Sequence, residues 1–241
     1  FASFCIHTGY PAGNQSRCIT RMNADLCNLG EAMAILLASG DGLRALRLFV
    51  GLEAYIGARL FADEARQWTE NALTLAPDAP VALRISTLYG LVNRAGVLGD
   101  AAASVAAAEA ALVLAETTDD ALLRGLAHFG LGIACAYAAQ TEPQNLAFAR
   151  AVSYCRLTDR IDFLASALAN LGHARSLEGD LRGAREALDE GLTYQRQIDD
   201  PTWSTGTLLW RGRVARAEGN QQMAVQVLTE GLMAAQAVHF E

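Results

Sequence analysis

Side chains that could do chemistry are present in the sequence, but none stands in a pattern typical of catalysis. No serine lies in a G-x-S-x-G motif, and the four histidines show no H-E-x-x-H spacing. All 19 basic residues are arginines, so the chain lacks the lysine of a P-loop or of a Schiff base. The sequence therefore predicts a protein that is not an enzyme, with no metal site and no cofactor.

Aromatic, amide and arginine side chains instead recur at equivalent positions, counted from Gly172 along a repeat of about 40 residues. Aromatic faces beside arginines and amides suit an extended peptide or an acidic helix, because arginine pairs with carboxylates through two parallel hydrogen bonds. The predicted binding stripe lies on the concave side of the repeats and consists of Tyr89, Asn93, Phe129, Tyr137, Asn170, His173, Trp210, Arg213 and Arg216.

The predicted helix at 202–218 contributes the strongest group of this stripe, because three of its residues share one helical face: Trp210, Arg213 and Arg216. Arg211 is expected to point elsewhere. Simpler interpretations stay open for the other members. Phe129 and Tyr137 could equally pack between helical hairpins, and His173 could be a polar residue without a dedicated partner.

Recurring helix ends would position these side chains. Gly99-Asp100, Gly179-Asp180 and Gly219-Asn220 are spaced by 80 and 40 residues, and Ala139-Gln140 occupies the place between them. Glycine suits the left-handed residue that ends a helix, and the following Asp or Asn can cap the next helix. A second set with the same spacing consists of small residues expected where paired helices approach closely: Gly132, Gly172 and Gly212.

Two helix starts are expected to use other residues. Thr141 is the predicted N-cap of one helix, with Pro143 in its first turn and Gln144 three residues further on. The pair Asp200-Pro201 offers a similar start for a later helix.

The spacing predicts an all-α, right-handed superhelix of about five helical hairpins, since one hairpin cannot bury its apolar face alone. A composition of 52% hydrophobic residues and only five prolines agrees with long helices. The chain begins at Phe1, not Met, which suggests a piece of a longer protein. The predicted parts are a connection at 1–20, a linker helix at 21–41 and a repeat domain at 42–241, with repeats at about 42–79, 80–119, 120–159, 160–200 and 201–241.

Charge and cysteine content exclude several classes of partner. The formal net charge of −7 argues against direct nucleic-acid binding, which relies on a basic face. No apolar run approaches the roughly 20 residues needed to cross a bilayer, and no signal peptide is visible. Five cysteines without a C-x-x-C pair argue against disulfides or a zinc site and favour reduced thiols in the cytoplasm.

Two resemblances add to this interpretation. The spacing of Gly172, Gly179, Ala184, Leu188 and Gly191 resembles the tetratricopeptide (TPR) signature, and it recurs in Gly212, Gly219, Ala224, Leu228 and Gly231. Leu168 and Leu208 replace the usual aromatic of the first helix, and Arg175 and Ala215 replace the usual tyrosine, so these repeats are divergent. The repeat length of 40 resembles the longer repeats of bacterial STAND-class regulators.

Residues 21–41 are similar to the helix that joins the ATPase part of such regulators to their repeats, with Cys27 and Gly30 as departures. The resemblance implies the C-terminal region of an ATP-dependent transcriptional regulator of LuxR or SARP type, in signal transduction.

The predicted function is therefore a non-enzymatic sensor or scaffold that binds a protein or peptide, or its own ATPase core. Two alternatives remain. A closed apolar cavity would favour a small-molecule inducer. An uncovered final helix would favour a homodimer, through Leu228, Leu232, Met233, Val238 and Phe240.

Overall fold

The computed structural model describes residues 26–56, 62–198 and 201–239, and in this part of the chain every regular element is an α-helix. The prediction of an all-α chain of helical hairpins is confirmed. The predicted connection at 1–20, Asp200 and Phe240 lie outside the described residues. The predicted division into five repeats stays a prediction.

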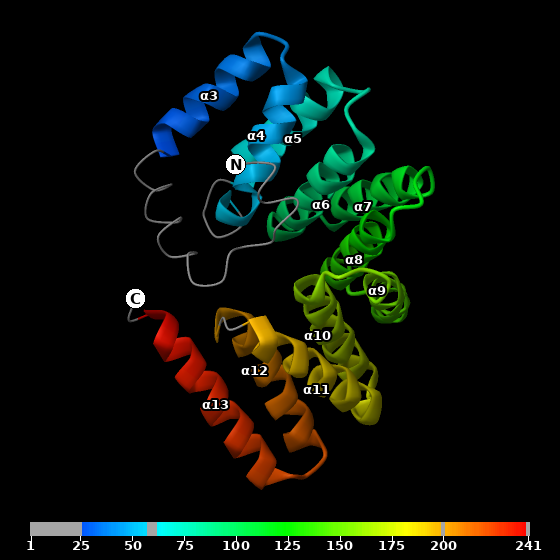
Figure 1. Cartoon of the computed structure of the whole chain (residues 1–241), viewed down its shortest axis with the longest axis vertical. Helices are drawn as coiled ribbons and strands as arrows, with labels where there is room; N and C mark the ends of the chain where they lie inside the picture. Colours follow the sequence, from blue (N-terminus) through cyan, green and yellow to red (C-terminus); the bar gives the residue numbers. More distant parts are fainter. Residues whose placement is uncertain (1–25, 57–61, 199–200, 240–241) are drawn as a thin grey trace. The chain divides into compact units, whose positions relative to one another are not determined.

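The chain forms two compact units, which divide between Ala139 and Gln140. That division falls inside the predicted repeat at 120–159. Figure 1 labels the helices of unit 1, and their bounds are α3 Leu26–Ala38, α4 Gly42–Ile56, α5 Ala62–Leu75, α6 Val81–Val97, α7 Ala101–Ala115 and α8 Ala121–Tyr137. The bounds in unit 2 are α9 Thr141–Cys155, α10 Ile161–Glu178, α11 Leu181–Ile198, α12 Pro201–Ala217 and α13 Gln221–His239.

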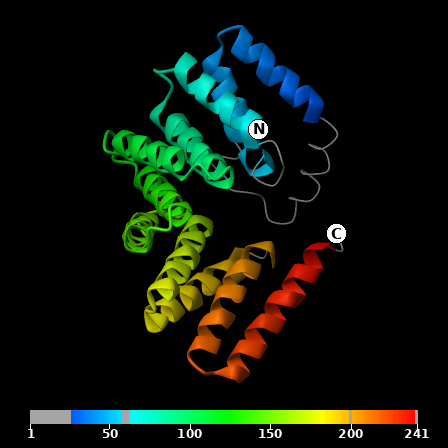
Figure 2. The same ribbon diagram turned by 180° about the vertical axis from the view of Figure 1, so that it is seen from behind.

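In unit 1 the helix α3, inside the predicted linker segment, shares a core with α4 and α5. Met33 of α3 and Phe49 of α4 are both fully buried in this core. A second core joins α6, α7 and α8 around Ile85 and Val92. Figure 2 shows the same helices from behind. The helix α3 is therefore packed as a part of unit 1.

The turns between paired helices use the predicted residues. Gly99, Gly179 and Gly219 have φ angles of 80°, 86° and 79°, and Gly40 has 75°. Side-chain caps follow at Asp41, Asp100, Asp180 and Asn220, each accepting a hydrogen bond from the backbone N–H three residues on. The glycine–cap pair is thus the common hinge of these hairpins.

The hinge before α9 departs from this pattern. Ala139 takes the left-handed place with a φ of 55°, the only positive φ of a non-glycine residue among the described residues. The prediction of Thr141 as N-cap is wrong: Gln140 is the N-cap, its side chain makes no capping bond, and Thr141 is already helical. The helix starts one residue early because Ala139-Gln140 follows the same register as Gly-Asp.

Paired helices approach closely where small and large side chains face each other. A Cβ added to Gly172 of α10 would lie 2.6 Å from Leu188 Cγ of α11. In the α6–α7 hairpin the sizes are reversed, since Val92 stands in the place of Gly172 and Ala108 in the place of Leu188, both fully buried. Each hairpin therefore fills the same space by a different division of volume between its two helices.

Candidate functional site

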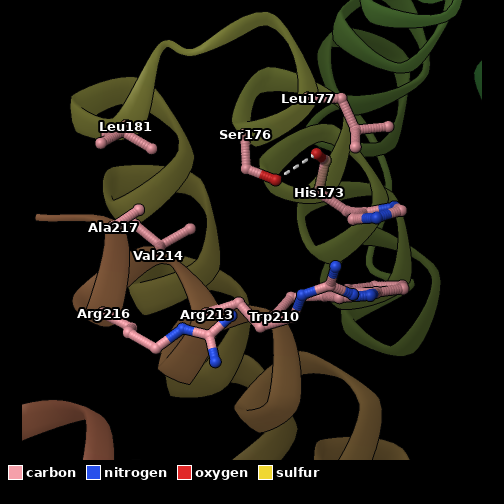
Figure 3. Close-up of a pocket in the computed structure, with 9 residues that line it drawn as sticks. All are labelled: His173, Ser176, Leu177, Leu181, Trp210, Arg213, Val214, Arg216 and Ala217. Atoms are coloured by element: carbon pink, nitrogen blue, oxygen red, sulfur yellow. Dashed lines mark hydrogen bonds between the residues drawn. The ribbon is translucent and has the colours of Figure 1, made fainter.

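The helices α10 and α12 of unit 2 line an open pocket of about 320 Å³, to which Leu181 at the start of α11 contributes one further residue. Figure 3 shows its lining, which consists of His173, Ser176, Leu177, Leu181, Trp210, Arg213, Val214, Arg216 and Ala217. Four of the nine predicted stripe residues therefore meet at one site. We call this site the α10–α12 pocket.

One wall of the pocket is a pair of stacked rings. The imidazole of His173 and the indole of Trp210 lie 4.5 Å apart between ring centroids, with an interplanar angle of 9°. Ser176 donates a hydrogen bond of 2.6 Å to the carbonyl oxygen of His173, one turn before it. Burial, and secondarily the positive charge of Arg213, lowers the pKa of His173 below its usual value. This wall is thus aromatic and uncharged near neutral pH.

The opposite wall is apolar and the rim is cationic. Leu181, Val214 and Ala217 lie across from the rings in Figure 3, and Val214 is almost fully buried. Arg213 and Arg216 are exposed, and no described residue forms an ion pair or hydrogen bond with either guanidinium. An apolar chamber with unpaired cations at its edge suits a ligand that is apolar in part and anionic in part.

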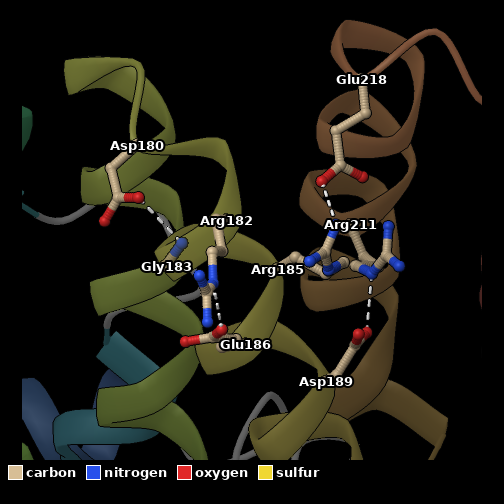
Figure 4. A network of polar contacts seen from close by, with 8 residues as sticks. All are labelled: Asp180, Arg182, Gly183, Arg185, Glu186, Asp189, Arg211 and Glu218. Atoms are coloured by element: carbon tan, nitrogen blue, oxygen red, sulfur yellow. Dashed lines mark hydrogen bonds and ion pairs between the residues drawn. The ribbon is translucent and has the colours of Figure 1, made fainter.

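Most other arginines of unit 2 are already paired with carboxylates, which makes Arg213 and Arg216 distinctive. Arg211, on the same helix, is only 6% exposed, and its Nε donates a 2.6 Å hydrogen bond to Asp189 of α11. Arg185 of α11 pairs in turn with Glu218, just beyond α12, as Figure 4 shows. These two pairs fix α12 against α11 and so hold Trp210 and Arg213 in place, and the expectation that Arg211 points away from the pocket holds.

The remaining predicted residues do not line the pocket. The amide of Asn170 donates to Ser166 O of its own helix, and that of Asn93 to Tyr89 O. In unit 1 the ring centroids of Tyr89 and Phe129 lie 6.0 Å apart. Phe129 is only 5% exposed, which agrees with the alternative that it packs between helices.

Tyr137 also packs within its own unit. Its ring is so close to α6 that a Cβ on Gly96 would lie 2.0 Å from Tyr137 Cδ2. The side chain is still 41% exposed.

Sequence reasoning missed five residues of the lining: Ser176, Leu177, Leu181, Val214 and Ala217. Four of them stand three, four or seven residues after His173 or Trp210, a spacing that places them on the same helical face. Helical periodicity could therefore have found them. Leu181 comes from another helix, and no local signal in the sequence connects it with the others.

Metal ligands and thiols are the other side chains to consider among the described residues. No group of histidine, cysteine and acidic side chains there could hold a metal ion. Burial raises the pKa of the Cys155 thiol to about 12, and that of Cys135 is also raised, chiefly by burial. Among the described residues, no helix is long and apolar enough to cross a membrane.

Comparisons with known proteins connect the chain to helical-repeat structures. No protein-family model and no curated protein matches the sequence. The crystal structure of BtubC from P. vanneervenii is similar with a TM-score of 0.71 and 17% identity, over 92% of each chain. A Rap protein complexed with Competence and Sporulation Factor has a TM-score of 0.69 and 15% identity, over 81% of this chain and 55% of that one.

YrrB, described as a TPR protein with an unusual peptide-binding site, has a TM-score of 0.52 and 17% identity, over 85% of this chain and 93% of that one. At these identities the likeness concerns the fold alone. The chain has a TPR-like helical-repeat fold.

Proposed function

We propose that the chain is a non-enzymatic interaction domain and that its α10–α12 pocket binds a segment of a partner protein. The observation that carries this proposal is the pair of unpaired arginines, Arg213 and Arg216, at the rim of a chamber walled by His173 and Trp210. Burial of an apolar anchor there supplies binding energy, and the guanidinium groups fix its orientation through charged hydrogen bonds.

Two structural neighbours support a binding role, and one of them supports a peptide as the ligand class. The Rap protein is complexed with Competence and Sporulation Factor, and YrrB has an unusual peptide-binding site. The pocket itself favours a side chain over a small-molecule inducer. Its volume of about 320 Å³ is at the low end of the range of about 300–1,000 Å³ for small-molecule sites. It is also open, because Leu177 is 57% exposed and both rim arginines reach solvent.

The similarity of residues 21–41 to a regulator's linker helix suggests where the segment comes from. In a STAND-class transcriptional regulator in the cytoplasm, the partner would be the regulator's own ATPase core, and the pocket would hold a segment of that core. This part of the proposal rests on the resemblance.

A display library of random peptides tests the binding function. We expect the wild-type chain to enrich a set of sequences whose affinity, measured by fluorescence anisotropy, falls at least about tenfold in Trp210→Ala and in Arg213→Ala. The control is Arg150→Ala, which removes an exposed arginine of α9 that does not line the pocket. If no sequence is enriched, or if both pocket variants bind like the wild type, the proposed site is wrong.

Self-association through α13 is a second candidate, favoured by its exposed apolar side chains. Val225, Leu232 and Met233 are 66%, 59% and 65% exposed. The side chains of Val238 and Phe240 lie outside the described residues. Light scattering of a Leu232→Glu, Met233→Glu variant tests a homodimer. We expect the wild-type mass to be twice that of the variant, with Leu146→Glu, on an exposed leucine of α9, as control. A monomeric wild type excludes it.

A further inference from the structure

The pocket has a counterpart in unit 1 that shows what fills such a space. The helices α6, α7 and α8 begin at residues 81, 101 and 121, and α10, α11 and α12 begin at 161, 181 and 201. Each pair of helices is therefore related by a shift of 80 residues, and Gly99 and Gly179 end equivalent helices with similar φ angles. Side chains at equivalent positions can be compared directly, unit by unit.

In unit 1 the chain fills the space with its own ring. Tyr137, the last residue of α8, lays its ring against the backbone of Gly96 in α6, where no Cβ stands in the way. The equivalent residues in unit 2 are Ala217 and Ser176, and both line the pocket. The α10–α12 pocket is thus open at the position where α8 carries a tyrosine and α12 an alanine.

The pocket of unit 2 also differs in charge from the equivalent positions of unit 1. Arg213 and Arg216 correspond to Ile133 and Ala136 in unit 1, so unit 2 carries two cations where unit 1 carries none. Neither guanidinium has a partner among the described residues. The pocket lacks the ring that Tyr137 provides in unit 1 and carries two positive charges. A ligand with both an aromatic ring and anionic groups would complement it.

We propose that the α10–α12 pocket recognises an aromatic side chain flanked by acidic residues within a partner segment. The ring of the ligand enters the pocket beside His173 and Trp210, in the space that corresponds to that of Tyr137 in unit 1. It lies slightly farther from the backbone of α10 than Tyr137 lies from α6, because Ser176 has a Cβ and Gly96 has none. Carboxylates of the neighbouring residues pair with Arg213 and Arg216. This inference rests on the proposed function and specifies the chemistry of its ligand.

The first test closes the pocket with the chain's own residue. The double variant Ala217→Tyr, Ser176→Gly rebuilds the arrangement of unit 1 in unit 2, and because Ala217 and Leu177 are exposed there the new ring has room to enter. We expect the double variant to keep the helix content and the unfolding midpoint of the wild type. Its affinity for the peptides selected by display should fall at least about tenfold. Unchanged affinity in a folded double variant would contradict the inference.

The second test varies the ligand and does not depend on any variant folding. The probe is a short acetylated and amidated peptide with a central tyrosine between aspartates, so that no terminal charge contributes. We expect it to bind with a Kd below about 1 mM, and replacement of the tyrosine by alanine, or of the aspartates by asparagines, to weaken binding at least about tenfold. Adding Arg213→Ala should remove the preference for aspartate over asparagine.

The outcomes separate this inference from the proposed function. If display enriches peptides that need Trp210 but lack aromatic and acidic residues, the pocket binds peptides and the ligand assignment is wrong. If the tyrosine–aspartate probe does not bind the wild-type chain, the ligand assignment is also wrong. If the probe binds but closing the pocket has no effect, the recognition lies elsewhere on the chain.

Discussion

The α6–α8 pair of unit 1 and the α10–α12 pair of unit 2 are built on the same 40-residue repeat and end differently. In unit 1, Tyr137 packs on Gly96 and occupies the space between the helices. In unit 2, Ala217 leaves that space open, and the pocket is lined by a stacked His173–Trp210 pair. The helices are spaced alike, and a few side chains decide whether the space between them is filled by a ring or left open as a pocket.

The same comparison holds within the hairpins, where it concerns stability. Val92 and Ala108 in α6–α7 stand where Gly172 and Leu188 stand in α10–α11. A large residue on the first helix is balanced by a small one on the second, or the reverse. Variants at these positions test each difference between the two units.

Exchange of volume across the hairpin should have the largest effect. Gly172→Val places a side chain within 3.0 Å of Ala184 O and Leu188, so we expect a loss of about 3 kcal/mol in the free energy of unfolding. Leu188→Ala alone should cost about 3 kcal/mol because it opens a cavity. The double variant restores the division of unit 1 and should be more stable than additivity predicts by about 1–3 kcal/mol.

Urea denaturation followed by circular dichroism measures this cycle. Strict additivity of the two single variants would contradict the volume balance and would mean that the two hairpins do not pack alike.

Removal of the ring that fills unit 1 should have the next largest effect. Tyr137→Ala opens the equivalent space, and since the side chain is 41% exposed we expect a loss of about 1.5 kcal/mol. Leu157→Ala, at a residue that is 74% exposed, serves as control and should change stability by less than about 0.5 kcal/mol. A Tyr137→Ala variant as stable as its control would show that the ring does not act as packing.

The hinge residues should give a smaller and opposite pair of effects. Ala139→Gly relieves a left-handed alanine and should stabilise the chain by about 0.5–1 kcal/mol. Gly179→Ala puts a Cβ on a residue with a φ of 86° and should cost about 1 kcal/mol, although its Cβ would meet nothing within 4 Å. Thermal unfolding of both variants measures the two changes in stability. Equal signs would contradict the equivalence of the two hinges.

The pH dependence of the open pocket should be the smallest effect. Because the pKa of His173 is lowered in the folded chain, the unfolded chain takes up this proton more readily below pH 6.5. The stability that neutral His173 contributes is therefore present above pH 6.5. It is lost as the pH falls through the pKa of His173 in the folded chain. The charged groups that line the pocket beside His173 are Arg213 and Arg216. Urea midpoints of wild type and His173→Gln between pH 7 and 5 should diverge in this direction; parallel curves would contradict it.

The sequence was a good guide to the fold because the hinge residues act locally. A glycine with a positive φ and a cap on the next residue are decided within one turn, as at Gly179 and Asp180. Thr141 misled because a capping motif one residue inside the helix looks the same in the sequence as one at its start. The shift by 80 residues could also be predicted, since it depends only on the lengths of the helices and of their connections.

The site was predictable only in part. Trp210, Arg213 and His173 could be placed together from helical spacing and the repeat, and the structure brings them to one pocket. For Tyr137 both partner binding and packing between hairpins stayed open, and the contact of its ring with Gly96 depends on the distance between α6 and α8. Distances between helices follow from packing over the whole hairpin, and the spacing of residues along the chain does not contain them.

Nuclear magnetic resonance of the tryptophan indole groups tests the central claim most directly. On adding the tyrosine–aspartate peptide to the labelled wild-type chain, we predict that the indole N–H resonance of Trp210 shifts, because a ring entering the α10–α12 pocket lies beside it. The resonance of Trp68, which is partly buried against the core of unit 1, should stay unchanged. A saturating peptide that leaves Trp210 unmoved would contradict the account.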